Sequence, residues 1–589
     1  GDAYFINRPV DSPFDANGNY VKQFYNKLAE AVYNEDYQKT MATYANIGGT
    51  IKIIPGLTYT TVNGINYNSI VENNYDSMNT FTGALSNGDA YRGQTSVFLW
   101  NSQHRFNFER SFGRSTISAI LGGEASDSER KSVSASGYGF ANDKIREVSA
   151  ALTKSGSSSG TEQSQLSYYA QANYSWDGKY HLIGSFRRDG NSDFGSDVSW
   201  ATFNSIGASW IISKESFWKS NAIDFAKLKF SFGTRGNSRI GAYKSKGVYK
   251  FDTDYGYNGE SGAKMSSGEN PILSWETTYS YNLGLSLSLF KRISLEMEAY
   301  YNKSVDLLDD IYVTNTTGFE RITQNIGSLR NRGFEITLNT QNIIKKDFTW
   351  NTSFNFSLNR NMVLSLYNNV ERRFETSIVR VGEDTKTNYL IRWAGVDPRD
   401  GGPLWYDTRG NLTKVYDPTN KVVAGRQTPD FFGGMTNTFE YKNFSLRGLF
   451  QYTVGGYLFS SLQRNSESDG RNLATQNQSR NQLDRWVEPG DLTLVPKTVL
   501  TENADNGRNS TRFLHSRSAF RISNISLNYR LPSELMKKLR LERANVYLQA
   551  DNVAVWTPYK SREGYNDFKN YSDPFPRPLV LSFGLNVGF

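Results

Sequence analysis

The chain has 589 residues, of which 38% are hydrophobic and 14% aromatic, and 66 Lys and Arg against 58 Asp and Glu give a formal charge of +8. No apolar run of about eighteen residues occurs, which excludes membrane-spanning helices, and the absence of cysteine excludes disulfide scaffolds and thiol catalysis. The basic residues are scattered rather than grouped, so we expect no nucleic-acid partner.

Residues 1–41 are polar and contain a turn near Gly18 and a possible short helix around Val21 to Tyr33. We expect them to form an extracellular loop that leads into a barrel. From Ala42 to Phe589 the chain repeats one pattern: a strand, a tight turn, a second strand and a long polar segment. No linker or change of composition divides these residues, which favours one large repetitive sheet.

The tight turns and the long segments alternate along the chain. The turns are expected at Pro55-Gly56, Gly113-Arg114, Asp177-Gly178, residues 213–223, Lys291-Arg292, residues 345–347, Lys442-Asn443 and residues 532–541. The long connections are expected at about 126–164, 234–270, 367–427 and 454–516. Short turns on one rim and long loops on the other are typical of outer-membrane barrels, with the short turns on the periplasmic side.

Hydrophobic and polar residues alternate within the expected strands. Leu283, Leu285, Leu287 and Leu289 interleave with glycine and serine, and Glu296 and Glu298 alternate with apolar residues in the next strand. A charged side chain facing lipid at mid-bilayer costs about 2 to 4 kcal/mol, so the charged face must be the lumen. We therefore predict an all-β, antiparallel transmembrane barrel with roughly seventeen strands in this chain.

The last eleven residues, 579–589, form an apolar-out, polar-in strand that ends on Phe589. A terminal aromatic of this kind resembles the signal read by the barrel-assembly machinery. An ordinary edge strand at a terminus is the alternative interpretation.

Several segments resemble the C-terminal part of the SusC-like family of TonB-dependent outer-membrane transporters of Bacteroidetes. These segments keep the family's order and cover the chain from Lys227 onwards. They are KLKFSFGTRGNS (227–238), NPILSWETTYSYNLGLSLSLF (270–290), YYNKSVDLL (300–308), NIGSLRNRGFEITLNT (325–340), WAGVDPRDGGPLWYDTRGN (393–411), TPDFFGGMTNTFEYKNFSL (428–446), RWVEPGD (485–491), RISNISLNYRLPSELMKKL (521–539) and LVLSFGLNVGF (579–589).

The resemblance implies a barrel of 22 strands, of which this chain would hold about the last seventeen. It also implies a plug domain and a TonB-binding segment, both expected outside this chain. The implied location is the Gram-negative outer membrane, in contact with its lipid. The implied partners are TonB and a SusD-like surface lipoprotein, and the implied cargo is an oligosaccharide or an oligopeptide.

The sequence offers no set of residues for catalysis, and we expect neither a cofactor nor a metal site. His104, His181 and His515 are far apart and lack ligand spacing. The segment 156–160 fits G-x-S-x-G, but it is expected in a serine-rich loop rather than between a strand and a helix. The chain is therefore not expected to be an enzyme.

Candidate cargo-contact residues are of two kinds. Charges on the inner face, Glu296, Glu298 and Arg447, could line a translocation path, as could Glu335 and Arg530. Trp393, Trp405 and Tyr406 are expected in an outer loop, where aromatic faces could stack on sugar rings. A solvated, mutually paired interior and plain loop packing are the respective alternatives.

The favoured function is TonB-dependent import of oligosaccharides with a SusD-like lipoprotein. An importer of oligopeptides and a passive outer-membrane pore are the alternatives. The pore is less favoured because it needs a complete, unplugged barrel, whereas the odd strand count and the long loops argue against one.

Overall fold

A single antiparallel sheet of 17 strands dominates the computed structural model. The structure describes residues 11–238, 240–257, 260–319, 321–473, 476–500, 507–558 and 577–588. The predicted all-β fold and the predicted number of strands are confirmed. The strands of this sheet are β1 (Glu35–Ile54), β2 (Leu57–Asp76), β3 (Asp89–Phe112), β4 (Ser115–Tyr138), β5 (Thr153–Trp176), β6 (Tyr180–Asn191), β7 (Trp200–Ile211), β8 (Ile223–Asn237), β11 (Glu276–Leu289), β12 (Ile293–Tyr312), β13 (Arg321–Ile344), β14 (Phe348–Ser365), β22 (Phe431–Tyr441), β23 (Phe444–Val454), β26 (Ala519–Arg530), β27 (Arg543–Trp556) and β28 (Val580–Gly588).

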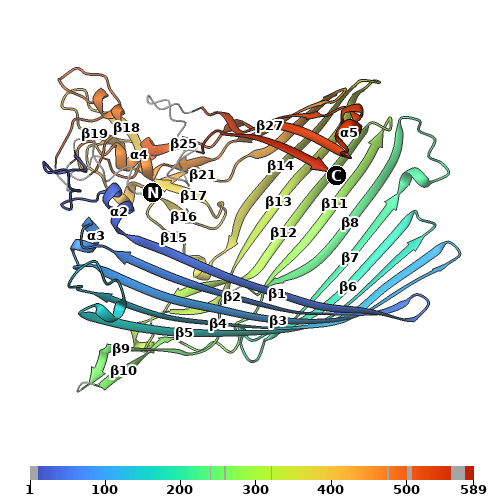
Figure 1. Ribbon diagram of the computed structural model, residues 1–589, viewed down its shortest axis with the longest axis horizontal. Helices are drawn as coiled ribbons and strands as arrows, with labels where there is room; N and C mark the ends of the chain where they lie inside the picture. Colours follow the sequence, from blue (N-terminus) through green and yellow to red (C-terminus); the bar gives the residue numbers. More distant parts are fainter. Residues whose placement is uncertain are drawn as a thin grey trace.

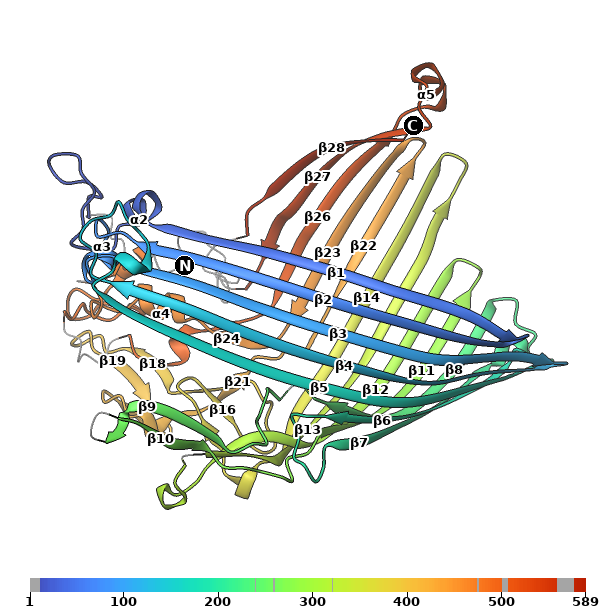
Figure 2. The ribbon, with the colours of Figure 1, turned by 60° about the horizontal axis from the view of Figure 1, so that its bottom comes forward.

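Each strand of the sheet pairs with the next one along the chain, and every pairing is antiparallel. The sheet curves strongly, so that β1 to β5 form one wall and β11 to β14 another (Figures 1 and 2). Strands β1 and β28 are its two edges, and no pairing joins them within the described part of the chain.

The tight turns lie where the sequence predicts them, at one end of the strands. Asp177 and Gly178 connect β5 to β6, and both have positive φ, of 54° and 60°. Positive φ at both central residues is the backbone conformation of a type I′ turn, which joins two hairpin strands because its twist matches theirs. The first strand, β1, begins at Glu35, ahead of the expected barrel start at Ala42.

The opposite ends of the strands carry the long connections, but one prediction about them is wrong. Residues 126–164 were expected to be a long polar segment, whereas β4 continues to Tyr138 and β5 begins at Thr153. Serine occupies both faces of these extensions, and Glu129, Lys131, Lys154 and Glu162 lie on the face that is apolar nearer to the tight turns, so the alternation disappears although the backbone pairing persists.

The other long connections contain small sheets of their own. Residues 238–275 hold the hairpin of β9 (Val248–Tyr257) and β10 (Glu260–Ser267). Between β14 and β22 lie one sheet of β15 (Arg372–Arg373), β16 (Ser377–Val379), β17 (Thr387–Leu390) and β21 (Val422–Arg426), and a second of β18 (Arg392–Val396), β19 (Pro403–Tyr406) and β20 (Leu412–Thr413). Between β23 and β26 lie β24 (Tyr457–Phe459) and β25 (Leu514–Ser516), which pair with each other.

The helices are short: α2 (Lys27–Tyr33), α3 (Phe81–Ala84), α4 (Ser461–Ser466) and α5 (Ser533–Leu539). None of the helices in the described residues is long and apolar enough to cross a membrane.

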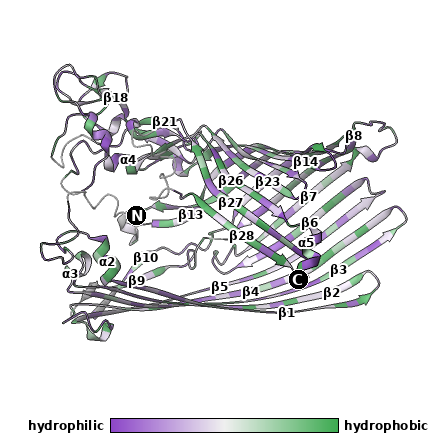
Figure 3. Ribbon diagram, turned by 45° about the horizontal axis from the view of Figure 1, so that its top comes forward, coloured by the Kyte–Doolittle hydropathy of each residue, from purple (hydrophilic) through white to green (hydrophobic). Residues whose placement is uncertain are grey.

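Hydrophobic and hydrophilic residues alternate along the strands (Figure 3). Leu283, on the expected lipid face, is 53% exposed, and its register partners on either side are Phe230 and Ala299. The largest fully buried side chains, such as Trp405, Leu390 and Phe513, lie mostly in the outer loops. The large sheet thus has an apolar surface on one side and a polar one on the other, and its compact packing is in the loops.

Candidate functional site: the inner wall

A continuous row of polar positions crosses the inner face of eight neighbouring strands. Residues directly opposite each other in an antiparallel pair share a face, so the register places the whole row on one side of the sheet. The row runs Thr116, Ser175, His181, Ser209, Lys229, Gly284, Glu298 and Glu335, from β4 to β13.

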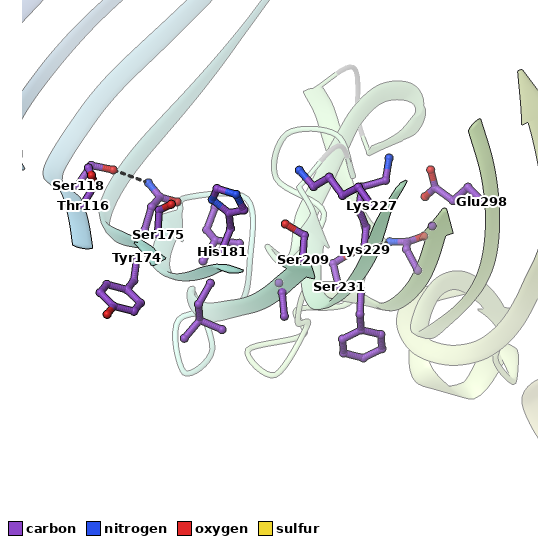
Figure 4. Close-up of a pocket in the computed structure, with 18 residues that line it drawn as sticks. Thr116, Ser118, Tyr174, Ser175, His181, Ser209, Lys227, Lys229, Ser231 and Glu298 are labelled. Atoms are coloured by element: carbon purple, nitrogen blue, oxygen red, sulfur yellow. Dashed lines mark hydrogen bonds between the residues drawn. The ribbon is translucent and has the colours of Figure 1, made fainter. Parts of the chain in front are cut away.

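A pocket of 520 Å3 lies along this row. Its charged lining residues are Lys227, Lys229 and Glu298, and His181 lies at the same wall. Figure 4 shows these side chains on one side of the sheet, with Tyr174 pointing to the other. The hydroxyl and amide side chains of the lining are those of Thr116, Ser118, Asn173, Ser175, Ser209, Ser231 and Asn282.

Gly284 keeps the centre of the pocket open. It lies between Lys229 on β8 and Glu298 on β12, and a Cβ at this position would meet the Lys229 Cε at 3.0 Å. Any side chain here would displace the lysine. The two lysines of β8 and Glu298 of β12 therefore line the same space.

The structure brings some of the predicted inner-face charges together and separates others. Glu296 and Glu298 are neighbours on the inner face of β12, and Glu335 is the register partner of Glu298. Arg447, on β23, has Thr438 and Ser526 as its register partners, and Arg530 is opposite Asn545. The two arginines thus belong to a different part of the wall from the pocket.

The three aromatic candidates lie in the outer loops, away from the pocket. Trp405 is 1% exposed, and its ring packs edge-on against Trp393 and Tyr416. Trp405 is therefore part of a loop core and offers no free face to a sugar ring. Tyr406 lies beside the Arg392 guanidinium, whose Cζ is 5.4 Å from the ring centroid.

A buried ion network lies within the loop between β23 and β26, and its arginine also contacts the loop between β14 and β22. Arg512 donates two hydrogen bonds to the Asp469 carboxylate, at 2.5 and 3.0 Å, and its Cζ lies 5.2 Å from the Trp393 ring centroid. Glu467 is 3.9 Å from the same guanidinium, and its burial raises its pKa above the usual value. The loop between β23 and β26 is thus held against β18, which belongs to the loop between β14 and β22.

The remaining predicted features are scattered. His104 bonds with Tyr59 on the outer face, His181 lies at the pocket, and His515 bonds with Gln463 in an outer loop. The segment 156–160 lies inside β5, paired with β4, rather than in the serine-rich loop that was expected. Phe589, the predicted assembly signal, lies outside the described residues.

Comparison with known proteins assigns the family. A family model described as "TonB dependent receptor-like, beta-barrel" matches residues 2–553. The chain belongs to this family. The protein is therefore an outer-membrane β-barrel. The alternating faces of its strands and the unequal lengths of its loops agree with this location.

The relatives extend well beyond this chain. TonB-dependent receptor P39 of Formosa agariphila is 28% identical over 98% of this chain and 61% of its own length. TonB-dependent receptor SusC of Bacteroides thetaiotaomicron is 26% identical over 87% of this chain and 52% of its own length. The chain therefore spans between 52% and 61% of the length of these two relatives. The resemblance to SusC-like receptors is confirmed.

Solved structures show the same barrel. The RagAB peptide importer in its closed-closed state superposes with a TM-score of 0.87 and 25% identity, over 98% of this chain and 66% of that chain. The open-open state of the same importer gives a TM-score of 0.86, over 98% of this chain and 65% of that chain.

Sequence reasoning did not single out Lys227 and Lys229 in this receptor barrel as site residues. A signal for them was present, because both alternate with Leu228 and Phe230, which are 38% and 48% exposed on the lipid face. What the sequence could not show is that β11 places a glycine beside them.

Proposed function

We propose that this chain forms most of the barrel of a TonB-dependent importer, which carries oligosaccharides across the outer membrane together with a SusD-like surface lipoprotein. The observation that carries the proposal is the polar inner wall, where hydroxyl and amide side chains line a 520 Å3 pocket. Such groups both donate and accept hydrogen bonds, as sugar hydroxyls do. The similarity to SusC supports the same assignment.

In this proposal the barrel does no bond chemistry. A plug blocks the lumen, and TonB moves the plug when cargo is bound on the extracellular side. The mechanism is therefore conformational gating. The strands upstream of this chain pair with the edges β1 and β28, because an unpaired strand edge exposes a full row of backbone donors and acceptors. The lipoprotein covers the outer loops, on the side away from the tight turns.

A peptide importer is the second candidate, and a specific observation favours it. The structures that superpose at TM-scores of 0.86 and 0.87 are those of a peptide importer. The two candidates share the barrel, the gating and the lipoprotein, and differ only in cargo.

Uptake in the native host tests the proposal. The gene for the full-length protein is deleted and restored, and entry of fluorescent oligosaccharides and oligopeptides of equal mass is measured with and without TonB. The proposal requires that oligosaccharide entry depends on both this gene and TonB. Entry that persists without TonB indicates a passive pore, and gene-dependent entry of peptides alone indicates the second candidate.

Purification gives a second, independent readout. The tagged full-length barrel is extracted in detergent, and proteins that stay bound at high salt are identified by mass. A lipid-modified surface protein at a fixed ratio to the barrel is expected. A barrel that purifies without any such protein contradicts the proposed partner.

A further inference from the structure

Neither of the two pocket lysines has a carboxylate partner among the residues that the structure describes. None of the ion pairs formed within 4.0 Å by the described residues includes Lys227 or Lys229. Both are half-buried, lie on the inner face of β8, and are two positions apart, which places their Cα atoms about 6.6 Å from each other. Two neighbouring ammonium groups repel each other, and an anion between them removes that repulsion.

The surroundings of the lysines are rich in hydroxyl groups. Ser209 on β7 is the direct register partner of Lys229. Ser231 lies two residues after Lys229 on β8 and lines the same pocket. The apolar residues nearest to them along the chain, Leu228 and Phe230, alternate onto the opposite face. A ligand beside the lysines therefore meets hydroxyl groups, and Ile183 adds an apolar contact on the same wall.

We propose that this pocket is a binding site for an acidic saccharide on its way through the barrel, with Lys227 and Lys229 holding its carboxylate or sulfate group. The sugar hydroxyls bond with the serine, threonine and asparagine side chains of the lining and with the Glu298 carboxylate. The proposal rests on the import function above and adds the charge class of the cargo.

Charge explains why an acidic saccharide fits better than a neutral one. An ammonium group donates a charge-assisted hydrogen bond to a neutral sugar oxygen as well, but a carboxylate or sulfate adds the attraction of an opposite charge and offsets the repulsion between the two lysines. The hydroxyl and amide groups of the lining suit a saccharide, because sugar hydroxyls also both donate and accept hydrogen bonds.

Binding to the full-length, purified transporter tests the proposal. The probes are a tetramer of galacturonic acid and its fully methyl-esterified form, which has the same length and sugar but no charge. Calorimetry should show that the acid binds at least ten times more tightly than the ester. In the double variant Lys227→Gln/Lys229→Gln, acid binding should weaken about tenfold or more while ester binding stays unchanged.

The control variant removes the same number of charges from the opposite face. Lys131 and Lys154 belong to the outer-face rows of β4 and β5, where their register partners are Gly160 and Gly137. Lys131→Gln/Lys154→Gln should bind the acid as the unchanged protein does. Equal loss in both double variants indicates a general field effect and overturns the site.

Three other outcomes also overturn the proposal. Equal affinity for acid and ester excludes charge selection, and tighter binding of a tetrapeptide than of the acid assigns the pocket to peptides. If the double variant instead lets vancomycin enter cells while acid binding is unchanged, the lysines hold a segment that fills the barrel. None of these results bears on TonB-dependent uptake itself, which the deletion experiment measures separately.

Discussion

Lys229 and Glu298 flank Gly284 on one row of the inner wall, so that a cationic and an anionic side chain face each other across a position without a side chain. A Cβ at Gly284 would meet the Lys229 Cε at 3.0 Å, and the free space beside it is part of the 520 Å3 pocket. The pocket thus needs a glycine at position 284, whereas the strand itself does not.

Replacing Gly284 with Leu should therefore close the pocket and leave the barrel intact. We expect uptake of cargo to fall about tenfold or more, because the side chain displaces Lys229 and fills the space that cargo needs. Uptake is measured in the native host, and folding by the mobility shift of the unheated barrel in gels. Gly184→Leu is the matched control, since Gly184 lies on the lipid face of β6 with nothing within 4 Å of its Cβ position. Equal uptake by the two variants contradicts the role of Gly284.

Opposite faces of β11 should respond oppositely to a new charge. Leu283→Arg puts a guanidinium on the lipid face and should destabilise the barrel by about 2 to 4 kcal/mol. Asn282→Arg, one residue earlier, places the same group on the inner face, where it meets water and should cost much less. Urea unfolding in lipid vesicles measures both. Equal losses at the two positions would mean that the assignment of faces is wrong.

The sequence predicted the sheet better than the loops because one physical signal dominates each membrane strand. Lipid on one side and water on the other force a period of two, which is why Leu283 and Glu298 were assigned to their faces. The signal fails above the membrane, where both faces of β4 and β5 meet water and the strands were mistaken for a loop. Turn residues gave a second signal, since Asp177-Gly178 was predicted to be a tight hairpin turn and both residues have the positive φ of such a turn.

The candidate site was only partly predictable. Glu298 was placed on the inner face from alternation alone, but its proximity to Lys229 depends on the pairing of β8, β11 and β12. Trp405 was proposed as a sugar contact because it is aromatic and in an outer loop. Its burial follows from contacts with Trp393 and Tyr416, and the contact with Trp393 depends on the β18 and β19 pairing, which no local pattern reveals.

The buried ion network should be a weak point when one partner is removed. Arg512→Ala leaves the Asp469 and Glu467 carboxylates buried without their cation, and we expect local destabilisation of about 3 to 5 kcal/mol. Hydrogen exchange in residues 460–516 should rise sharply. Arg399→Ala is the control, because that side chain is 84% exposed and water screens its pair with Asp397. Similar exchange in the two variants would show that the network does not hold the loops.

The same loop should loosen in acid because of His515. Burial of the His515 imidazole lowers its pKa to about 4, below the usual value of about 6.5, and the ring bonds with Gln463. Because folding lowers the pKa of His515, the unfolded chain takes up a proton at this histidine more readily than the folded chain does. The free energy of unfolding is therefore unaffected by His515 above about pH 6.5, and it decreases by at most about 3 kcal/mol as the pH falls toward 4. Glu467 acts in the opposite direction, since burial raises its pKa and protonation relieves the buried charge.

Comparison of variants isolates the histidine. Hydrogen exchange of β24 and β25, where His515 pairs with Leu458, is measured at pH 7 and pH 4.5 in the unchanged protein and in His515→Gln. The unchanged protein should lose protection at pH 4.5 after correction for the intrinsic rate, and the variant should lose much less. His104→Gln, altered on a strand far from the loop, should behave as the unchanged protein does. Equal acid sensitivity of His515→Gln and the unchanged protein would assign the loosening to other groups, because only the histidine differs between them.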